Sequence, residues 1–363
     1  MAILSSGSDS RKDRGYANSS LNLFFNLQKN DDCIVHFYKG DGKQDKKNNT
    51  YVVKNFGKQK WVHRKGNKIG DTFVYEYIIF ALCFLFFSFF SRRKYDAIYT
   101  QEPRVAKTLY QLKFLLPGKP EICFGLGVKM TPEHYVNISD KVHVVNVEHY
   151  SAAITAYSDL NKFYLIPNPG SESKTYKEGL SKAELIRKFN IKTEKVVLSV
   201  GAINSSIKRM DYVVREASKL DSTWTLILLG SPKEKDIIEM GKELLGDRFV
   251  HLFVPPENVP EIFCVADVFV LASVIEGFGN VTIEAMQNGV PPVVHDRELN
   301  NWILRDDELL VDMLEENALY NFIISKEMSW FSCKGLDVKR VYGERYSWEA
   351  LESKYLKLFN VTE

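Results

Sequence analysis

Short apolar runs alternate with amphipathic stretches along most of the chain. Eleven of these runs have the length and the bounding turn residues that are typical of buried parallel strands. They lie at 2–6, 33–38, 96–100, 121–126, 142–146, 163–167, 196–201, 224–230, 250–254, 267–273 and 291–295. Amphipathic stretches such as 210–220 and 233–246 predict helices between them. Strands that alternate with helices predict an α/β fold whose parallel sheets are covered on both faces.

The turn IPNPGSES at 166–173 contains two prolines and a glycine and is the best candidate for a linker. A chain of 363 residues is also too long for one typical core, so two domains are expected. We therefore predict a doubly wound, Rossmann-like domain on each side of this turn. Because such domains bind ligands at the carboxyl ends of their strands, the two domains are expected to face one another across a ligand-binding cleft.

Composition narrows the class of protein. Hydrophobic residues make up 45% and charged residues 26% of the chain, which is ordinary for a soluble globular protein. The five cysteines are far apart and form no Cys-x-x-Cys pair, so neither a zinc site nor a disulfide framework is predicted. The N-terminal sequence MAILSSGSDS lacks the basic and apolar regions of a signal peptide. We therefore expect a protein of a reducing compartment, the cytoplasm.

Charge is distributed unevenly along the chain. Residues 1–166 hold 24 Lys and Arg against 15 Asp and Glu, whereas the remainder holds 24 against 31. This asymmetry predicts different partners for the two domains, with an anionic substrate or surface facing the basic one. Solvated surface lysines would give the same count, so charge alone leaves both interpretations open.

The segment EGFGNVTIEAMQNGVPPVV, residues 276–294, carries the clearest chemistry. A loop that leaves a buried strand and enters a helix presents backbone N–H groups and partial positive charge, and therefore binds phosphate. Gly277 and Gly279 let the backbone approach a ligand closely. Glu284, one helical turn into the helix, can accept two hydrogen bonds from a vicinal diol such as ribose, and Glu276 can do the same for sugar hydroxyls. An ordinary helix glutamate at 284 is the alternative.

This segment resembles the E-x7-E signature of glycosyltransferase family 4, the group 1 glycosyltransferase-like proteins, which are retaining enzymes of the GT-B fold. IPNPG resembles the interdomain turn of the family, and VLSVGAINSSIKRMDYVV resembles the strand, loop and helix that follow. LILLG and VPEIFCVADVFVLAS match later strands, and YSWEALESKYLKLF resembles the terminal helix that crosses back to the first domain. The resemblance is specific over residues 165–359 and mainly topological before them.

The resemblance implies an N-terminal acceptor domain at 1–166, a C-terminal donor domain at 167–345 and a returning helix at 346–363. The donor would be a nucleotide diphosphate sugar, a substrate, and no cofactor is expected. By motif position Glu276 would contact the donor sugar, Glu284 the ribose, and the turn near Val254 the base. The sugar and the phosphates would lie against the residues between the two glutamates, namely Gly277, Phe278, Gly279, Asn280 and Val281.

The loop after the strand at 196–201 departs from the family pattern. Ala202 stands where the family has its diphosphate-binding arginine. Lys208 aligns with the family lysine, and Arg209 replaces a glycine and is expected to supply the missing guanidinium. Two cations beside a diphosphate stabilise the charge that develops as it leaves, so we assign Lys208 and Arg209 to catalysis together with Glu276. A surface Lys-Arg pair is the alternative, although cations at a helix start oppose the helix dipole.

The first domain is less informative. Gly15 follows a long polar loop near the start of a predicted helix and is placed close to the donor phosphates. Gly125 and Gly127 occupy the region in which many family members carry a histidine, so that residue cannot be carried over. Glu102, at the end of a predicted strand, is a weaker candidate for a residue of the crevice.

The absence of other motifs argues against several classes of enzyme. No two aspartates stand two apart, so the Asp-x-Asp metal motif of the other major glycosyltransferase fold is absent and no metal is implied. The chain has no P-loop, no G-x-S-x-G, no H-E-x-x-H and no G-x-G-x-x-G sequence. No nucleic-acid partner is predicted.

Residues 73–90, FVYEYIIFALCFLFFSFF, are apolar apart from one glutamate and one serine and lead into Ser-Arg-Arg-Lys. This length is at the short limit for a membrane span, and spanning would separate the segment from the strand that follows. We expect a buried helix of the first domain. The functional alternative is that its phenylalanines and flanking cations contact a membrane surface, as is expected for an enzyme with a lipid-linked acceptor.

These observations predict a two-domain, metal-independent retaining glycosyltransferase that moves a sugar from a nucleotide diphosphate donor to an unidentified acceptor. A glycan and a lipid-linked molecule are the candidates for this acceptor. Three alternatives stay open. A nucleotide-sugar epimerase would share the architecture but use no acceptor. A catalytically inactive sugar-nucleotide-binding protein would explain Ala202. A tandem dinucleotide-binding oxidoreductase fits the order of strands but lacks the glycine fingerprint.

Overall fold

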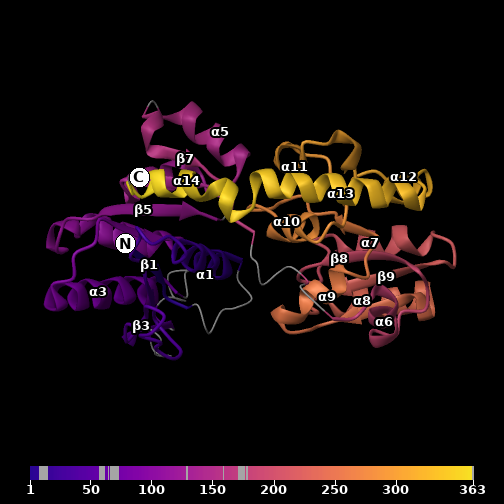
Figure 1. Cartoon of the computed structure of the whole chain (residues 1–363), viewed down its shortest axis with the longest axis horizontal. Coiled ribbons are helices and arrows are strands. Elements are labelled where there is room, and N and C mark those ends of the chain that lie inside the picture. The colour runs from indigo at the N-terminus through magenta and orange to yellow at the C-terminus, as the bar shows by residue number, and fades with distance from the viewer. Residues whose placement is uncertain are drawn as a thin grey trace. The chain divides into compact units, whose positions relative to one another are not determined.

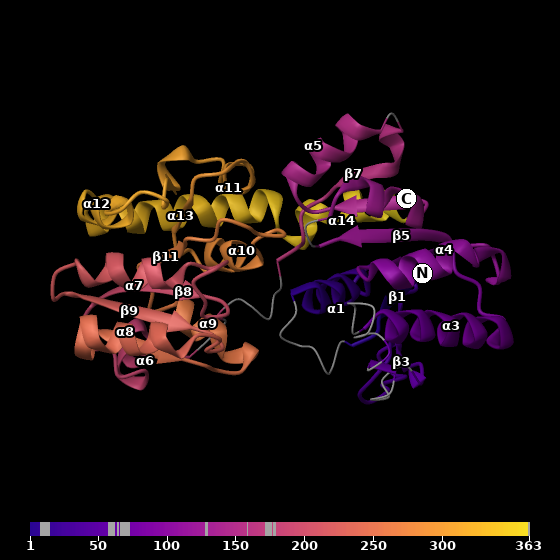
Figure 2. The ribbon, with the colours of Figure 1, turned by 180° about the vertical axis from the view of Figure 1, so that it is seen from behind.

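A computed structural model describes residues 1–7, 15–56, 62–63, 65, 73–127, 130–157, 159–170, 176 and 179–361. The chain divides into two compact units (Figures 1 and 2). The first unit consists of Met1–Pro169 and Leu351–Glu363, and the second of Gly170–Ala350.

The first unit is built on a parallel sheet with the strand order β3-β2-β1-β4-β5-β6-β7. Its strands are β1 (Ala2–Ser5), β2 (His36–Lys39), β3 (Thr50–Val52), β4 (Ala97–Thr100), β5 (Glu121–Leu126), β6 (Lys141–Val144) and β7 (Phe163–Leu165). Its helices include α1 (Gly15–Leu27), α3 (Val74–Ser91), α4 (Pro103–Gln111), α5 (Val147–Ala156) and most of α14 (Trp348–Leu358). Every residue of β1, β4 and β6 is buried, as the central strands of a doubly covered parallel sheet require.

The second unit has a parallel sheet with the order β10-β9-β8-β11-β12-β13. Its strands are β8 (Lys195–Val200), β9 (Trp224–Leu229), β10 (Phe249–Leu252), β11 (Val268–Leu271), β12 (Pro292–His295) and β13 (Leu310–Val311). Its helices include α6 (Lys182–Lys188), α7 (Met210–Ser218), α8 (Lys235–Leu245), α9 (Val259–Phe263), α10 (Asn280–Gln287), α11 (Glu298–Leu304), α12 (Ala318–Ile324) and α13 (Met328–Arg345). In both views α10 and α13 lie on one side of β8 and β9, and α8 lies on the other.

Each of the eleven predicted strands overlaps an observed strand, and the predicted α/β class is confirmed. Two strands were not predicted. The three residues of β3 are all half-buried, and β13 has two residues, so neither produces an apolar run. Both lie at the edge of a sheet, where short strands with mixed exposure are common.

A buried polar network joins the returning helix α14 to the sheet of the first unit. The Tyr355 hydroxyl donates to the Pro167 carbonyl at 2.9 Å and lies 3.4 Å from His143 Nε2. His143 Nε2 also lies 2.8 Å from the Ile166 carbonyl, and its Nδ1 lies 3.0 Å from the Tyr99 hydroxyl. Burial lowers the pKa of His143 to about 4. The imidazole is therefore neutral at pH 7, with Nε2 as donor and Nδ1 as acceptor.

The helix predicted at 73–90 is observed as α3, but it is buried along one face only. Phe80 and Phe84 are fully buried in the core of the first unit, whereas Phe86, Phe89 and Phe90 are more than half exposed. Among the described residues, α3 is the one helix long and apolar enough to cross a membrane by length and composition. The expectation of a buried helix therefore holds for one face of α3, and 33% of its residues are buried.

Candidate functional site

The candidate site lies where two neighbouring strands of the second unit end. Strand β8 pairs with β9 on one side and with β11 on the other. From this pair the chain winds outward in opposite directions, so the loops after β8 and β11 diverge and leave room between them. These loops run over residues 201–209 and 272–279. They contain the lysine and the first glutamate singled out in the sequence.

Lys208 and Glu276 meet between these loops. Lys208 Nζ donates to Glu276 Oε1 at 2.5 Å, and the two side chains are 18% and 12% exposed. At this depth the attraction between ammonium and carboxylate is screened much less than on an open surface. The site therefore presents a positive and a negative group side by side at the carboxyl edge of the sheet.

The loop that carries Lys208 is held by one asparagine. Asn204 Oδ1 accepts from the backbone N–H groups of Ile207 and Lys208, each at 2.9 Å. Its Nδ2 donates to the Ala202 carbonyl at 3.1 Å. An asparagine that bonds backbone groups three and four residues further on fixes a turn without help from a regular element. Asn204 thereby positions the lysine for its contact with Glu276.

Two glycines allow the strand ends to pack tightly beneath this loop. Gly201 and Gly230 follow β8 and β9 and adopt φ of +147° and +153°, which side-chain-bearing residues rarely do. A Cβ on Gly230 would lie 1.8 Å from the Gly201 carbonyl oxygen. A Cβ on Gly201 would lie 3.1 Å from Lys208 Cε, so the lysine stem covers this glycine. The position of Lys208 depends on both glycines.

The second loop ends at the N-terminus of α10. Gly279 is the N-cap of α10, with φ of 87° and ψ of 46°, a left-handed conformation that favours glycine. Phe278 is buried, and its ring centroid lies 6.4 Å from those of Trp302 and Tyr346, so its side chain anchors the loop. Gly277 is half-buried. The backbone N–H groups at the start of the helix provide a partial positive charge at this edge.

Two buried hydroxyls lie in the same stretch of chain. Ser273 and Thr282 are both fully buried, and within the described residues neither hydroxyl has a hydrogen-bond partner. Buried polar atoms normally have partners, so these two are unusual. Asn280, Val281 and Glu284 are half-buried in the first two turns of α10.

Arg209 is placed differently from Lys208. It is the N-cap of α7, in a left-handed conformation with φ of 48° and ψ of 41°. Its Nη1 donates to the Met313 carbonyl at 2.6 Å, and its guanidinium carbon lies 4.7 Å from the centroid of the Tyr212 ring. The guanidinium therefore connects the first turn of α7 to the loop after β13.

The remaining predicted residues are spread over both units. Val254 is half-buried and lies two residues beyond the end of β10. In the first unit Gly15 is the first residue of α1, and residues 8–14 before it lie outside the described residues. Glu102 is buried where β1 and β4 diverge, and its carboxylate accepts from the Ser6 N–H at 2.9 Å and the Ser6 hydroxyl at 2.8 Å. This contact ties two strand ends together.

Gly125 has a packing role where many family members carry a histidine. A Cβ on Gly125 would lie 2.2 Å from the Tyr99 hydroxyl and 2.8 Å from Gln101 Cγ. The space beside β5 is thus filled by side chains of β4 and the residue that follows it. A larger residue at 125 would displace Tyr99 from the network around His143.

Comparison with known proteins shows which family the chain resembles. Residues 181–324 match the family model of the group 1 glycosyl transferases, and this range contains both diverging loops and α10. The chain is group 1 glycosyltransferase-like. Glu276, Glu284 and Lys208 all lie inside the matched range of this glycosyltransferase-like chain.

A curated relative of known activity is similar to part of the chain. A Campylobacter jejuni N-acetylgalactosamine-N,N'-diacetylbacillosaminyl-diphospho-undecaprenol 4-alpha-N-acetylgalactosaminyltransferase is 30% identical over 131 residues, 35% of this chain and 36% of its own length. The chain spans 27–58% of the length of the curated relatives that it matches.

Two solved structures are similar over nearly the whole chain. They are a sucrose-phosphate synthase from Thermosynechococcus elongatus, with 20% identity and a TM-score of 0.77, and Anabaena HepE in complex with UDP-glucose, with 15% identity and a TM-score of 0.74. Each covers 99% of both chains. The fold of this glycosyltransferase-like chain is therefore GT-B, with two parallel-sheet units.

Several residues that shape the site were not predicted to do so. Gly201 and Gly230 each end an apolar run, and a glycine at that position is a readable signal for a close backbone approach. Asn204 lies in a polar loop that has several residues with the same turn propensity, so nothing local singles it out. The Met313 carbonyl belongs to the backbone, and no sequence pattern predicts its contact with Arg209.

Proposed function

We propose that this chain transfers a hexose from a nucleotide diphosphate sugar to an acceptor, with retention of anomeric configuration and without a metal ion. The contact between Lys208 and Glu276 carries this proposal. A diphosphate sugar needs a cation for its phosphates and a hydrogen-bond acceptor for its sugar hydroxyls, and this pair offers both beside the N-terminus of α10.

Each residue has a distinct part in the proposed reaction. The Lys208 ammonium binds the diphosphate, while the Glu276 carboxylate accepts hydrogen bonds from the sugar. The bond between the anomeric carbon and the diphosphate oxygen breaks, and the oxygen of the acceptor hydroxyl forms a new bond to that carbon on the same face. The proton of that hydroxyl passes to the departing diphosphate. Negative charge grows on the departing diphosphate, where Lys208 stabilises it more than in the ground state. Glu284 holds the ribose diol, and the turn at Val254 contacts the base.

The proposed acceptor is a glycan or a lipid-linked glycan. The name of the Campylobacter relative includes a diphospho-undecaprenol acceptor, and the structure of HepE contains UDP-glucose. The first 166 residues of this chain are basic, as suits an anionic acceptor or surface. We place the reaction in the cytoplasm, with the protein in peripheral contact with a membrane. We propose no cofactor, since the donor is a substrate.

A thermal-shift screen with uridine, guanosine and adenosine diphosphate sugars tests donor binding. A ligand that binds only the folded state raises Tm, by an amount equivalent to about 2.7 kcal/mol at a hundredfold excess over Kd. Glu284→Ala should reduce the affinity for the donor roughly ten- to a hundredfold, because charged hydrogen bonds contribute about 1.5–3 kcal/mol. Glu239→Ala, in the exposed middle of α8, is the matched control and should bind donor normally.

NMR of the bound donor then separates the proposed transferase from its alternatives. An epimerase would convert the donor into a new sugar nucleotide without acceptor. A catalytically inactive protein, as Ala202 in place of the family arginine would allow, would bind donor and leave it unchanged with every acceptor. Without acceptor we expect only slow hydrolysis of the donor. With a glycan or lipid-linked acceptor we expect faster loss of the donor and transfer of the sugar to that acceptor with retained configuration. Failure of every nucleotide sugar to raise Tm would overturn the proposal.

A further inference from the structure

The outward face of α3 is aromatic over its second half. Phe86, Phe89 and Phe90 are 65%, 53% and 66% exposed, and Leu82 one turn earlier is 42% exposed. The rings of Phe86 and Phe90 lie 4.4 Å apart, so they form one continuous surface. Side chains this large are seldom gathered on the surface of a monomer unless they contact a partner.

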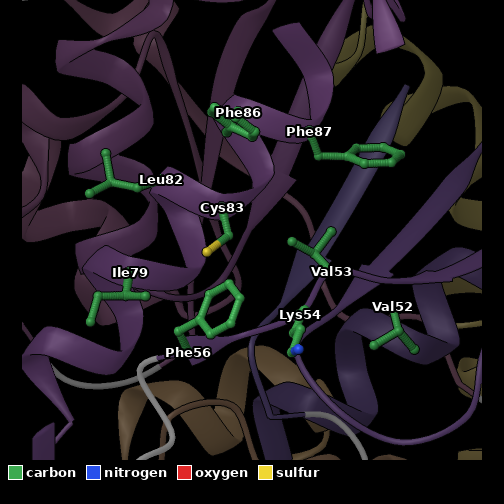
Figure 3. A pocket seen from close by; sticks show the side chains of 9 residues that line it. All are labelled: Val52, Val53, Lys54, Phe56, Ile79, Leu82, Cys83, Phe86 and Phe87. Carbon is green, nitrogen blue, oxygen red and sulfur yellow. The ribbon is translucent and has the colours of Figure 1, made fainter. Parts of the chain in front are cut away.

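A groove of about 410 Å³ opens between this face and the segment after β3 (Figure 3). It is lined by Val52, Val53, Lys54, Phe56, Ile79, Leu82, Cys83, Phe86 and Phe87. Figure 3 shows Phe56 and Lys54 on one wall and the α3 side chains on the other. Eight of the nine lining residues are apolar, and the volume lies in the range of ligand pockets, about 300–1,000 Å³. The groove is therefore suited to a hydrocarbon chain.

Cations stand at the borders of the groove and of the aromatic face. Lys54 is exposed, and its Nζ lies 5.1 Å from the centroid of the Phe56 ring. Arg92 and Lys94 are exposed directly after α3. The single carboxylate within α3, Glu76, is buried and lies 2.7 Å from His63 Nε2. The surface thus joins aromatic rings with positive charge, which is the pattern of a site for anionic lipid.

The same helix cannot span a bilayer while the fold is intact. Phe80 and Phe84 are fully buried in the core cluster that also contains residues of β1, β4 and β5. Strand β4, five residues beyond α3, lies in the middle of the sheet. Contact with lipid must therefore involve the exposed face, with α3 lying along the membrane surface.

We propose that an anionic phospholipid of the membrane docks on this face, with one hydrocarbon chain in the groove between α3 and Phe56 and its phosphate beside Lys54. Phe86, Phe89 and Phe90 enter the interfacial layer around it. The site lies wholly in the first unit and uses none of the residues assigned to sugar transfer. The proposed site specifies the class of lipid for the peripheral membrane contact that belongs to the proposed function. Binding of this lipid does not require the sugar donor.

Flotation with vesicles tests the surface, and protection of a thiol tests the groove. We use vesicles of phosphatidylcholine with 30% phosphatidylglycerol and vesicles of phosphatidylcholine alone. The protein should float with the anionic vesicles at low salt. Lys54→Glu should weaken binding by about thirtyfold, since each charge near such a surface contributes about 1 kcal/mol and this substitution changes the charge by two. Modification of Cys83, in the groove, by a maleimide should slow at least fivefold with anionic vesicles. Cys333, exposed on α13, should react at an unchanged rate and is the internal control.

Three outcomes would overturn the proposal. The protein could fail to float with anionic vesicles at low salt. It could float while Cys83 reacts at its lipid-free rate, which would leave surface contact without an occupied groove. Cys83 could also become protected without lipid as protein concentration rises, which would show that a second copy covers the face. Donor binding, followed by Tm in the same samples, is expected to survive all three, so this test and the test of sugar transfer fail separately.

Discussion

Lys208 and Glu276, 68 residues apart in the chain, are joined by a contact of 2.5 Å between ammonium and carboxylate. They meet because β8 and β11 are neighbours in the sheet although two strands separate them in sequence. Their side chains are largely shielded from water, so each charge is stabilised mainly by the other and only weakly by solvent. A ligand that binds here replaces the contact between Lys208 and Glu276 with one contact of its own to each side chain.

The first prediction concerns Lys208 as the group that meets the leaving diphosphate. Lys208→Ala should lower kcat about a hundredfold or more, because loss of one preorganised donor to developing charge typically costs that much. Affinity for the bare nucleoside should change little, since the nucleoside carries no phosphate. Steady-state kinetics with the best donor of the thermal-shift screen, together with nucleoside titration, measures both quantities.

Lys188→Ala is the matched control for this variant. Lys188 also contacts a glutamate in the second unit, Glu261, at 2.5 Å, but both side chains are more exposed and the pair lies on α6 and α9. An exposed pair of this kind contributes about 0–1 kcal/mol to stability. If Lys188→Ala and Lys208→Ala reduce kcat by the same factor, the effect on kcat reflects general destabilisation and the catalytic assignment is wrong.

The second prediction separates two roles of Arg209. Its left-handed backbone is unfavourable for a residue with a side chain, whereas its guanidinium donates to the Met313 carbonyl. Arg209→Ala loses the contact and keeps the strain, while Arg209→Gly loses the contact and relieves the strain. We expect urea denaturation to show Arg209→Gly as more stable than Arg209→Ala by about 1 kcal/mol.

Turnover tests whether Arg209 also replaces the arginine that the family has at position 202. Both Arg209 variants should transfer sugar more slowly at unchanged affinity for the nucleoside, because the charge that Arg209 meets grows in the transition state. Normal turnover in both variants would limit Arg209 to its contact with Met313 and Tyr212.

The sequence predicted the parts of this site better than their arrangement. Glu276 was found by a local pattern, a glycine turn after an apolar run, and Lys208 by its alignment with a lysine of the family that the sequence resembles. Their contact depends on the order of strands in the sheet, which periodicity does not encode, because every buried parallel strand gives a similar apolar run. For α3 the favoured expectation of a buried helix was incomplete for a related reason, since its sequence is apolar around the whole helix and does not show which face is exposed.

The third prediction concerns the glycine pair under Lys208. Gly230→Ala should be strongly destabilising, by about 3 kcal/mol or more, because its Cβ would overlap the Gly201 carbonyl oxygen at a φ of +153°. Gly343→Ala is the control, since Gly343 lies in the last turn of α13 and its added Cβ would have no atom within 4 Å apart from its chain neighbours and the backbone of its own helix. That variant should gain about 0.5–1 kcal/mol. Equal stability of the two variants in urea denaturation would contradict the close approach of the strand ends.

The last prediction follows from the neutral histidine beneath α14. Burial lowers the pKa of His143 to about 4, against 6.5 for the free side chain. Above pH 6.5 the imidazole is neutral in both the folded and the unfolded chain, and its full contribution is present. Between pH 6.5 and 4 the unfolded chain binds a proton that the folded chain does not, so stability falls as pH falls, by on the order of 3 kcal/mol over this window.

His143→Gln isolates this contribution. Its amide can donate towards the Ile166 carbonyl and accept from the Tyr99 hydroxyl, but it does not titrate. Urea denaturation from pH 7 to 4.5 should therefore show a shallower loss of stability for His143→Gln than for the unmodified protein, even where its stability at pH 7 is lower. His134→Gln, an exposed position, should keep the original slope. Since protonated carboxylates destabilise all three proteins alike, the difference in slope reports on His143. Parallel slopes in His143→Gln and the unmodified protein would mean that His143 binds its proton equally in the folded and the unfolded chain, and that burial does not lower its pKa.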